Sequence, residues 1–187
     1  ARSLNIPAVR MLQMMNEERF LYLLQRVGFT TFGKPASHYG LSLILGGGEA
    51  NLWELAGAYS SMARVLKNNN EGKGYTTGDW HMPVLMHAEA GALTPDQSPP
   101  LSASAIWLTY EALKRVNRPE TETGWQYFGS APEVAWKTGT SFGYRDAWAI
   151  GTTPEYVVAI WAGNADGEDR PGLSGIASAA PLLFDII

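Results

Sequence analysis

The stretch Trp136-Lys137-Thr138-Gly139-Thr140-Ser141-Phe142-Gly143-Tyr144-Arg145-Asp146-Ala147-Trp148 places a short glycine-containing turn between two β-prone segments. Together with the apolar run that follows, it predicts three strands, at residues 134–140, 146–152 and 156–163. The connections at 141–145 and 153–155 are long enough only for hairpins. We therefore expect an antiparallel three-stranded meander.

The chain before this sheet has a helical pattern. Pro7 suits the first turn of a helix, with Ser3 and Asn5 on the loop that enters it. Asn16 can cap a second helix that ends at Gly28, and Asn51 with Glu54 can cap a long third one. The apolar positions of these helices are three and four residues apart, as for amphipathic helices: Phe20, Leu23, Leu24 and Val27 in the second, and Leu52, Leu55, Ala56, Tyr59, Met62, Ala63 and Leu66 in the third.

Two more helices are expected, one capped by Ser102 or Ser104 and ending before Pro119, and one at 176–187 that covers the sheet. Pro181 should kink this last helix or move its start further along the chain. Residues 68–78 are polar and rich in glycine, and 93–100 hold three prolines, so both segments are predicted to be turns or loops. Helices followed by an antiparallel sheet indicate an α+β fold, here in one domain.

Composition excludes several classes of function. The 187 residues are 45% hydrophobic and 17% charged, which is typical of a globular chain. A net charge of −4 without a basic run argues against nucleic acid as a partner, and zero cysteines exclude disulfides and thiolate chemistry. No apolar run reaches the roughly 18 to 20 residues of a membrane span. The first residues resemble neither a signal peptide nor an initiator region, so we expect the chain to begin within a longer protein.

The Lys-Thr-Gly-Thr run has the groups needed to bind a carboxylate. Lys137 carries an ammonium, and Thr138 and Thr140 carry hydroxyls. Gly139 lacks the side chain that would obstruct a ligand strand, and the N–H of Thr140 can point at a developing oxyanion. The alternative is an ordinary strand whose lysine extends to solvent.

Ser3-Leu4-Asn5 is a second candidate motif, although a serine or asparagine before a helix is most simply a cap. A Gly-x-Ser-x-Gly match at residues 139–143 resembles a nucleophile elbow, but another strand follows it and every histidine lies upstream. His81 and His87 lack a carboxylate at zinc-site spacing, so we expect no metal. The glycines at 46–48 lack the lysine of a phosphate loop, and no cofactor is expected.

Several stretches, in this order, resemble the transpeptidase domain of class A penicillin-binding proteins. The stretches are Ala1-Arg2-Ser3-Leu4-Asn5-Ile6-Pro7-Ala8-Val9, Gly40-Leu41-Ser42-Leu43-Ile44-Leu45-Gly46-Gly47, Glu54-Leu55-Ala56-Gly57-Ala58-Tyr59, residues 136–148 and Ala179-Ala180-Pro181. The form of residues 140–148 looks most like the 1C subgroup. The resemblance implies a penicillin-binding transpeptidase and β-lactamase-like fold with an antiparallel sheet covered by helices. It also implies a serine enzyme that cross-links peptidoglycan through an acyl-enzyme.

In that family a serine one helical turn before a lysine attacks the D-Ala-D-Ala carbonyl, and no Ser-x-x-Lys occurs in these 187 residues. The resemblance therefore implies that residues 1–187 are the C-terminal part of the transpeptidase domain. The Ser-x-x-Lys segment and a glycosyltransferase domain would lie upstream. By resemblance, Ser3, Asn5 and Lys137 are catalytic, and Thr138, Gly139 and Thr140 bind substrate.

The partners implied by the resemblance are peptidoglycan stem peptides and β-lactams, at the periplasmic face of the bacterial inner membrane. Membrane association would come only from regions outside this chain, and the chain alone should be inactive. Two alternatives stay open. One is a serine β-lactamase or D,D-carboxypeptidase, which would share the Lys-Thr-Gly strand. The other is a scaffold domain that kept the fold without catalysis.

Overall fold

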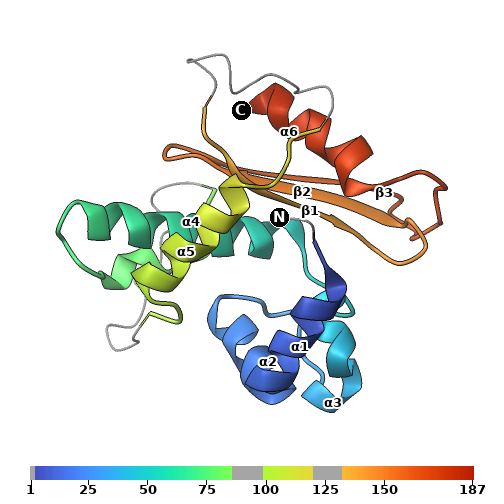
Figure 1. Ribbon diagram of the computed structural model, residues 1–187, viewed down its shortest axis with the longest axis horizontal. Helices are drawn as coiled ribbons and strands as arrows, with labels where there is room; N and C mark the ends of the chain where they lie inside the picture. Colours follow the sequence, from blue (N-terminus) through green and yellow to red (C-terminus); the bar gives the residue numbers. More distant parts are fainter. Residues whose placement is uncertain (1–2, 86–98, 120–131) are drawn as a thin grey trace. The chain divides into compact units, whose positions relative to one another are not determined.

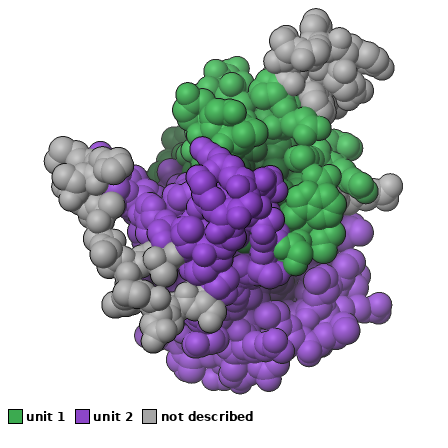
Figure 2. Space-filling view, turned by 90° about the vertical axis from the view of Figure 1, so that its left-hand side faces the viewer, with its two compact units in different colours: residues 1, 104–187 green, residues 2–103 purple. Residues whose placement is uncertain are grey.

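The structure is a computed structural model that describes residues 3–85, 99–119 and 132–187. The described residues divide into two compact units, one before residue 104 and one comprising residues 104–187 (Figure 2). Most of the loop expected at 93–100 lies outside the described residues. No helix in the described part of the chain is both long enough and apolar enough to span a membrane.

The first unit is helical (Figure 1). Its elements are α1 (Asn5–Met15), α2 (Glu17–Arg26), α3 (Ala36–Tyr39), η1 (Gly40–Leu45), α4 (Leu52–Asn70) and η2 (Thr77–Asp79). The predicted cap at Asn16 is confirmed, because its side chain accepts from the N–H groups of Glu18 at 2.8 Å and Arg19 at 3.4 Å. Gly28, at φ +111°, follows the end of α2 in a conformation that favours glycine.

Three expectations for this unit were wrong or incomplete. Asn5 is the first residue of α1, not part of the loop, and Ser3 lies before the helix with φ 49°. The asparagines at 68–70 end α4, not a turn. Short helices at Ala36–Tyr39 and Gly40–Leu45 were not foreseen, because each is too short to show a helical period.

Asp79 explains why α4 continues to Asn70. Its buried carboxylate accepts from the Thr76 N–H at 2.9 Å and from the Asn68 side chain, while Arg64 Nε donates to its backbone oxygen at 3.0 Å. These bonds connect the last turns of α4 to η2. Because a buried carboxylate must be hydrogen-bonded, the contacts hold the asparagine-rich end of α4 in place.

Glu54 is both a helix cap and a link between segments. The predicted capping box with Asn51 is present at the start of α4. The same carboxylate, only 3% exposed, also accepts from the Thr30 N–H at 2.8 Å, the Thr30 hydroxyl at 2.6 Å and the Thr31 hydroxyl at 2.9 Å. Burial alone would raise the pKa of Glu54, but the bonds from Thr30, Thr31 and Asn51 together lower it below 4.5.

This cluster predicts a pH-dependent stability. A carboxylate whose pKa is lower in the folded than in the unfolded protein contributes its full stabilisation at pH values above the unfolded pKa of 4.5. This stabilisation is lost as the pH falls through the folded pKa. Glu54→Gln should cost about 1–3 kcal/mol of unfolding free energy at pH 7 and flatten the acid dependence. Denaturant unfolding between pH 7 and pH 3 measures both, with Glu49→Gln, at an exposed position, as the control. Equal acid sensitivity in Glu54→Gln and wild type would contradict this role.

The second unit contains the sheet. Its elements are α5 (Ala103–Lys114), β1 (Ala135–Thr140), β2 (Asp146–Thr152), β3 (Val157–Gly163), η6 (Gly175–Ala179) and α6 (Ala180–Ile186). The strands pair antiparallel in the order β1-β2-β3, so the predicted meander is confirmed. The α+β fold class is confirmed as well.

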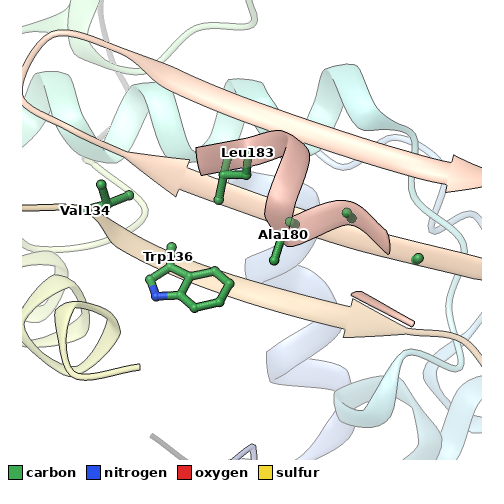
Figure 3. Packing of buried hydrophobic residues seen from close by; sticks show 7 residues of the cluster. Val134, Trp136, Ala180 and Leu183 are labelled. Carbon is green, nitrogen blue, oxygen red and sulfur yellow. The ribbon is translucent and has the colours of Figure 1, made fainter. Parts of the chain in front are cut away.

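The core of this unit lies between the sheet and α6 (Figure 3). Trp136 from β1 packs against Leu183 and Ala180, and its ring centroid lies 5.0 Å from that of Phe184 in an edge-on arrangement. Its indole N–H donates to the backbone oxygen of Val116 at 3.1 Å. Strand alternation therefore places Trp136, Thr138 and Thr140 on the α6 face, and Lys137 and Gly139 on the other face.

The last helix forms in two parts, as Pro181 predicted. Residues Gly175–Ala179 make a π-helical turn, and α6 starts at Ala180 with Pro181 in its first turn. Proline fits there because the first helical N–H groups have no partner within the helix.

Candidate functional site at the β1 edge

β1 is an edge strand of the sheet. The N–H and C=O groups of every second residue in it point away from β2, toward the open edge. Ser141 N–H donates to Asp146 O at 3.0 Å, which fixes the hydrogen-bonding register of the hairpin. Every second residue back from Ser141, namely Gly139 and Lys137, therefore points its backbone toward β2. Thr138 and Thr140 point their N–H and C=O groups outward. Among the described strands, none pairs with this edge of β1, so an extended ligand can add to it as a further strand.

Lys137 lies at this edge. Its half-buried side chain donates from Nζ to the Thr138 carbonyl oxygen at 2.6 Å. Burial lowers the pKa of Lys137 below its ordinary value of 10.5, because the charged form loses hydration. The ammonium therefore lies beside the outward-pointing backbone of β1, where a ligand carboxylate could bind it.

Thr140 has a hydroxyl that already accepts one hydrogen bond. The N–H of Gly175, at the start of η6, donates to Thr140 Oγ1 at 2.9 Å. Thr138 lies on the same face, close to Gly175. The two threonines thus lie beside the start of the last helix, a neighbour that the sequence pattern did not reveal.

Gly139 faces Trp148 of β2 in the register. A Cβ atom at Gly139 would lie 3.5 Å from the Trp148 Cβ, which is an ordinary contact. Trp148 in turn lies near Trp161 of β3, with ring centroids 6.4 Å apart. The packing of the sheet therefore does not require a glycine at position 139. That this glycine leaves space for a ligand stays a prediction.

Ser141 lies in a hairpin and not in a strand-to-helix turn, so the nucleophile-elbow interpretation is excluded. Its hydroxyl accepts from the Asp146 N–H at 2.8 Å. At the tip of the same hairpin Phe142 is 99% exposed.

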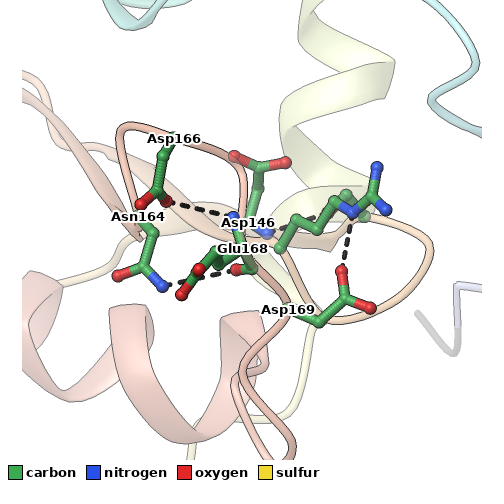
Figure 4. Close-up of polar contacts among 7 residues, drawn as sticks. Asp146, Asn164, Asp166, Glu168 and Asp169 are labelled. Carbon is green, nitrogen blue, oxygen red and sulfur yellow. Dashed lines mark hydrogen bonds and ion pairs between the residues drawn. The ribbon is translucent and has the colours of Figure 1, made fainter.

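The hairpin is held against the loop that follows β3 (Figure 4). Arg145 Nε donates to Asp169 Oδ1 at 2.7 Å, and Arg170 N–H donates to Tyr144 O at 3.1 Å. Both side chains of the ion pair are well exposed, so its contribution to stability is small. These contacts orient the turn directly after the candidate site.

Ser3 and Asn5 are exposed and belong to the first unit, while Lys137, Thr138, Gly139 and Thr140 share β1 in the second. The structure thus brings the four β1 residues together. That Ser3 and Asn5 join them stays a prediction. Of the histidines, His81 contacts the Met82 backbone oxygen through Nδ1 at 2.7 Å, and His87 lies outside the described residues. Within residues 3–85, 99–119 and 132–187, no group of three potential metal ligands occurs.

Sequence comparison finds relatives over nearly the whole chain. It is 37% identical over 191 aligned residues to penicillin-binding protein 1C of Escherichia coli, covering 99% of this chain and 22% of that protein. It is 29% identical to penicillin-binding protein 1A of Neisseria cinerea, covering 98% of this chain and 23% of that protein. No family model matches. The chain therefore spans about a fifth of the length of these relatives.

Structure comparison agrees on the fold. The chain matches the crystal structure of penicillin-binding protein 1A from Haemophilus influenzae with a TM-score of 0.61 and 18% identity, over 93% of this chain and 31% of that one. The resemblance to penicillin-binding proteins, greater for the 1C type than for the 1A type, is confirmed, and the helices with their antiparallel sheet have the fold of the matching part of that penicillin-binding protein 1A.

Proposed function

We propose that this chain is the carboxylate-binding part of a peptidoglycan D,D-transpeptidase whose nucleophilic serine lies outside these 187 residues. The single observation that carries the proposal is the outer edge of β1. There the Lys137 ammonium and the outward backbone groups of Thr138 and Thr140 lie side by side, on the edge of β1 that no other described strand pairs with. An edge of this kind binds an extended peptide through its main chain and binds the terminal carboxylate through charge.

The chemistry follows from these groups. The carboxylate of an acyl-D-Ala-D-Ala peptide, or of a β-lactam, binds the Lys137 ammonium and the threonine hydroxyls. The outward N–H of Thr140 then lies where a carbonyl oxygen can develop negative charge during acyl transfer. The serine that attacks this carbonyl and the lysine that acts on its proton would come from the longer protein. We further propose that the longer protein works at the periplasmic face of the inner membrane.

In this proposal Ser3 and Asn5 belong to the same site as Lys137, as a proton relay and an amide-binding group. The relevant test is a double-mutant cycle in the longer protein, measured as the rate of acylation by a labelled penicillin. If Ser3 and Lys137 share one site, the effects of Ser3→Ala and Lys137→Ala should be coupled by more than about 0.5 kcal/mol. Ser37→Ala, exposed on α3, is the matched control and should be additive with Lys137→Ala.

Additive effects of Ser3→Ala and Lys137→Ala would overturn the shared site. So would an experimental structure with the Ser3 hydroxyl more than about 10 Å from the Lys137 ammonium, too far for direct or single-water contact. A fast hydrolysis of the acyl-enzyme would instead favour the β-lactamase or carboxypeptidase alternative. A complete protein that never acylates would favour the scaffold alternative.

A further inference from the structure

The start of the last helix is hydrogen-bonded to the candidate site through the Thr140 hydroxyl. The Gly175 N–H donates to Thr140 Oγ1, at 2.9 Å. A threonine hydroxyl has two acceptor lone pairs and one donor hydrogen. Because the oxygen accepts from Gly175, the hydroxyl hydrogen is directed away from this N–H, and it can be donated to a ligand. Thr140 is an exposed residue, whereas Gly175 is buried.

Only glycine fits at position 175. A Cβ atom there would lie 2.5 Å from the Gly139 carbonyl oxygen, 2.6 Å from the Trp148 carbonyl oxygen and 2.8 Å from the Thr138 Cβ. The first two are backbone atoms of β1 and β2 and cannot rotate away. The absence of a side chain therefore lets the Gly175 N–H reach the strand that carries Lys137.

The helix that starts here is also unusual. Gly175–Ala179 is a π-helical turn. Such turns are rare in proteins, and those that occur often lie at functional sites. Ser174 caps it, with Oγ accepting from the Ala177 N–H at 3.3 Å. With this cap in place, the Gly175 N–H is left to bind the strand.

We propose that Gly175 is a positioning residue for carboxylate recognition. Its N–H orients the Thr140 hydroxyl so that this hydroxyl donates a hydrogen bond to the carboxylate. This inference rests on the proposed function, because it assumes that a carboxylate binds at the β1 edge. It adds a residue 35 positions away from Thr140, which acts through the Thr140 hydroxyl.

The arrangement couples ligand binding to Gly175. When the Thr140 hydroxyl donates to an anion, its oxygen becomes more negative and accepts more strongly from the Gly175 N–H. A carboxylate ligand should therefore shift the amide proton resonance of Gly175 downfield. A ligand without the charge should not.

The experiment is a ¹⁵N-resolved NMR titration of the 187-residue chain with N-acetyl-D-Ala-D-Ala, and in parallel with its C-terminal amide. The acid should shift the amides of Thr138 and Thr140 and move Gly175 downfield, while the neutral amide ligand leaves Gly175 in place. Thr140→Val, of similar shape, should abolish the Gly175 response and weaken acid binding by about tenfold or more. Thr140→Ser should restore the response, and Thr109→Val, exposed on α5, should behave as wild type.

The outcomes separate the two claims. If the acid shifts Thr138 and Thr140 but not Gly175, or if Thr140→Val keeps the Gly175 response, the positioning role is wrong and the proposed function stands. If neither ligand shifts any β1 amide, the carboxylate site itself is wrong. A Gly175 shift of equal size with both ligands would also overturn the positioning role, because it would not depend on charge.

Discussion

Lys137→Ala should reduce the affinity of the chain for N-acetyl-D-Ala-D-Ala by about 10- to 100-fold, because a charge-assisted hydrogen bond contributes about 1.5–3 kcal/mol. The half-buried ammonium lies at the edge where the carboxylate is proposed to bind. Affinity for the C-terminal amide of the same peptide should change little, since that ligand lacks the charge. Isothermal titration of both ligands measures the difference.

The pH dependence should follow from the same residue. Burial lowers the pKa of Lys137, so its charge is complete only below that pKa and disappears as pH rises through it. Acid affinity should therefore fall with an apparent pKa below 10.5. Lys67→Ala, exposed on α4, is the matched control and should keep both the affinity and its pH profile. Equal losses for the acid and the amide after Lys137→Ala would contradict carboxylate recognition by this lysine.

Gly175→Ala should destabilise the second unit by about 3 kcal/mol, at the upper end of the range for overpacking. The added methyl would lie within 2.6 Å of two backbone oxygens, so either η6 or the β1-β2 hairpin must move. For a chain of this size such a loss corresponds to a fall in Tm of roughly 6–12 °C. Thermal unfolding followed by circular dichroism measures it.

Gly139→Ala is the matched control for stability, because it adds the same methyl to the same region. Its Cβ would lie 3.5 Å from Trp148, an ordinary contact, and alanine is no worse than glycine in a strand. Its unfolding free energy should therefore stay within about 1 kcal/mol of wild type. A Gly175→Ala variant as stable as Gly139→Ala would contradict the close packing of the start of η6 against β1 and β2.

The sheet could be predicted from the sequence because its signals are local. β-prone segments separated by short turns determine both the strands and their antiparallel pairing, and the predicted strand 146–152 matches β2 at both ends. The caps at Asn16 and Asn51 were also predictable, since each depends on residues two or three positions away. Pro181 likewise predicted a late start for the final α-helix.

The contacts that were missed join residues far apart in the chain. The Thr140–Gly175 bond spans 35 positions, and the Thr30–Glu54 bonds span 24. Nothing in the pattern around Glu54 separates a simple cap from a buried link between two segments. Similarly, Asn68 continues α4 because Asp79 offers it an acceptor, against the turn that its polar surroundings suggest.

The candidate site was predictable in part for the same reason. Lys137, Thr138, Gly139 and Thr140 are consecutive, so one strand places them together once β1 forms. Which backbone groups face the open edge follows only from the pairing register, which requires the structure. The orientation of the Thr140 hydroxyl depends on Gly175, for which the sequence offered only a glycine before a helix.

The central claim is that these 187 residues supply carboxylate binding and not the nucleophile. The most direct measurement is mass-spectrometric mapping of a covalent penicillin adduct, on this chain alone and on the longer protein. We predict no adduct on this chain, since acyl transfer needs a serine activated by a neighbouring base, and no Ser-x-x-Lys occurs in it. In the longer protein the adduct should lie on a serine outside these residues, and Lys137→Ala should slow its formation. An adduct that survives denaturation and maps to Ser3, Ser141 or any other residue of this chain would contradict the claim.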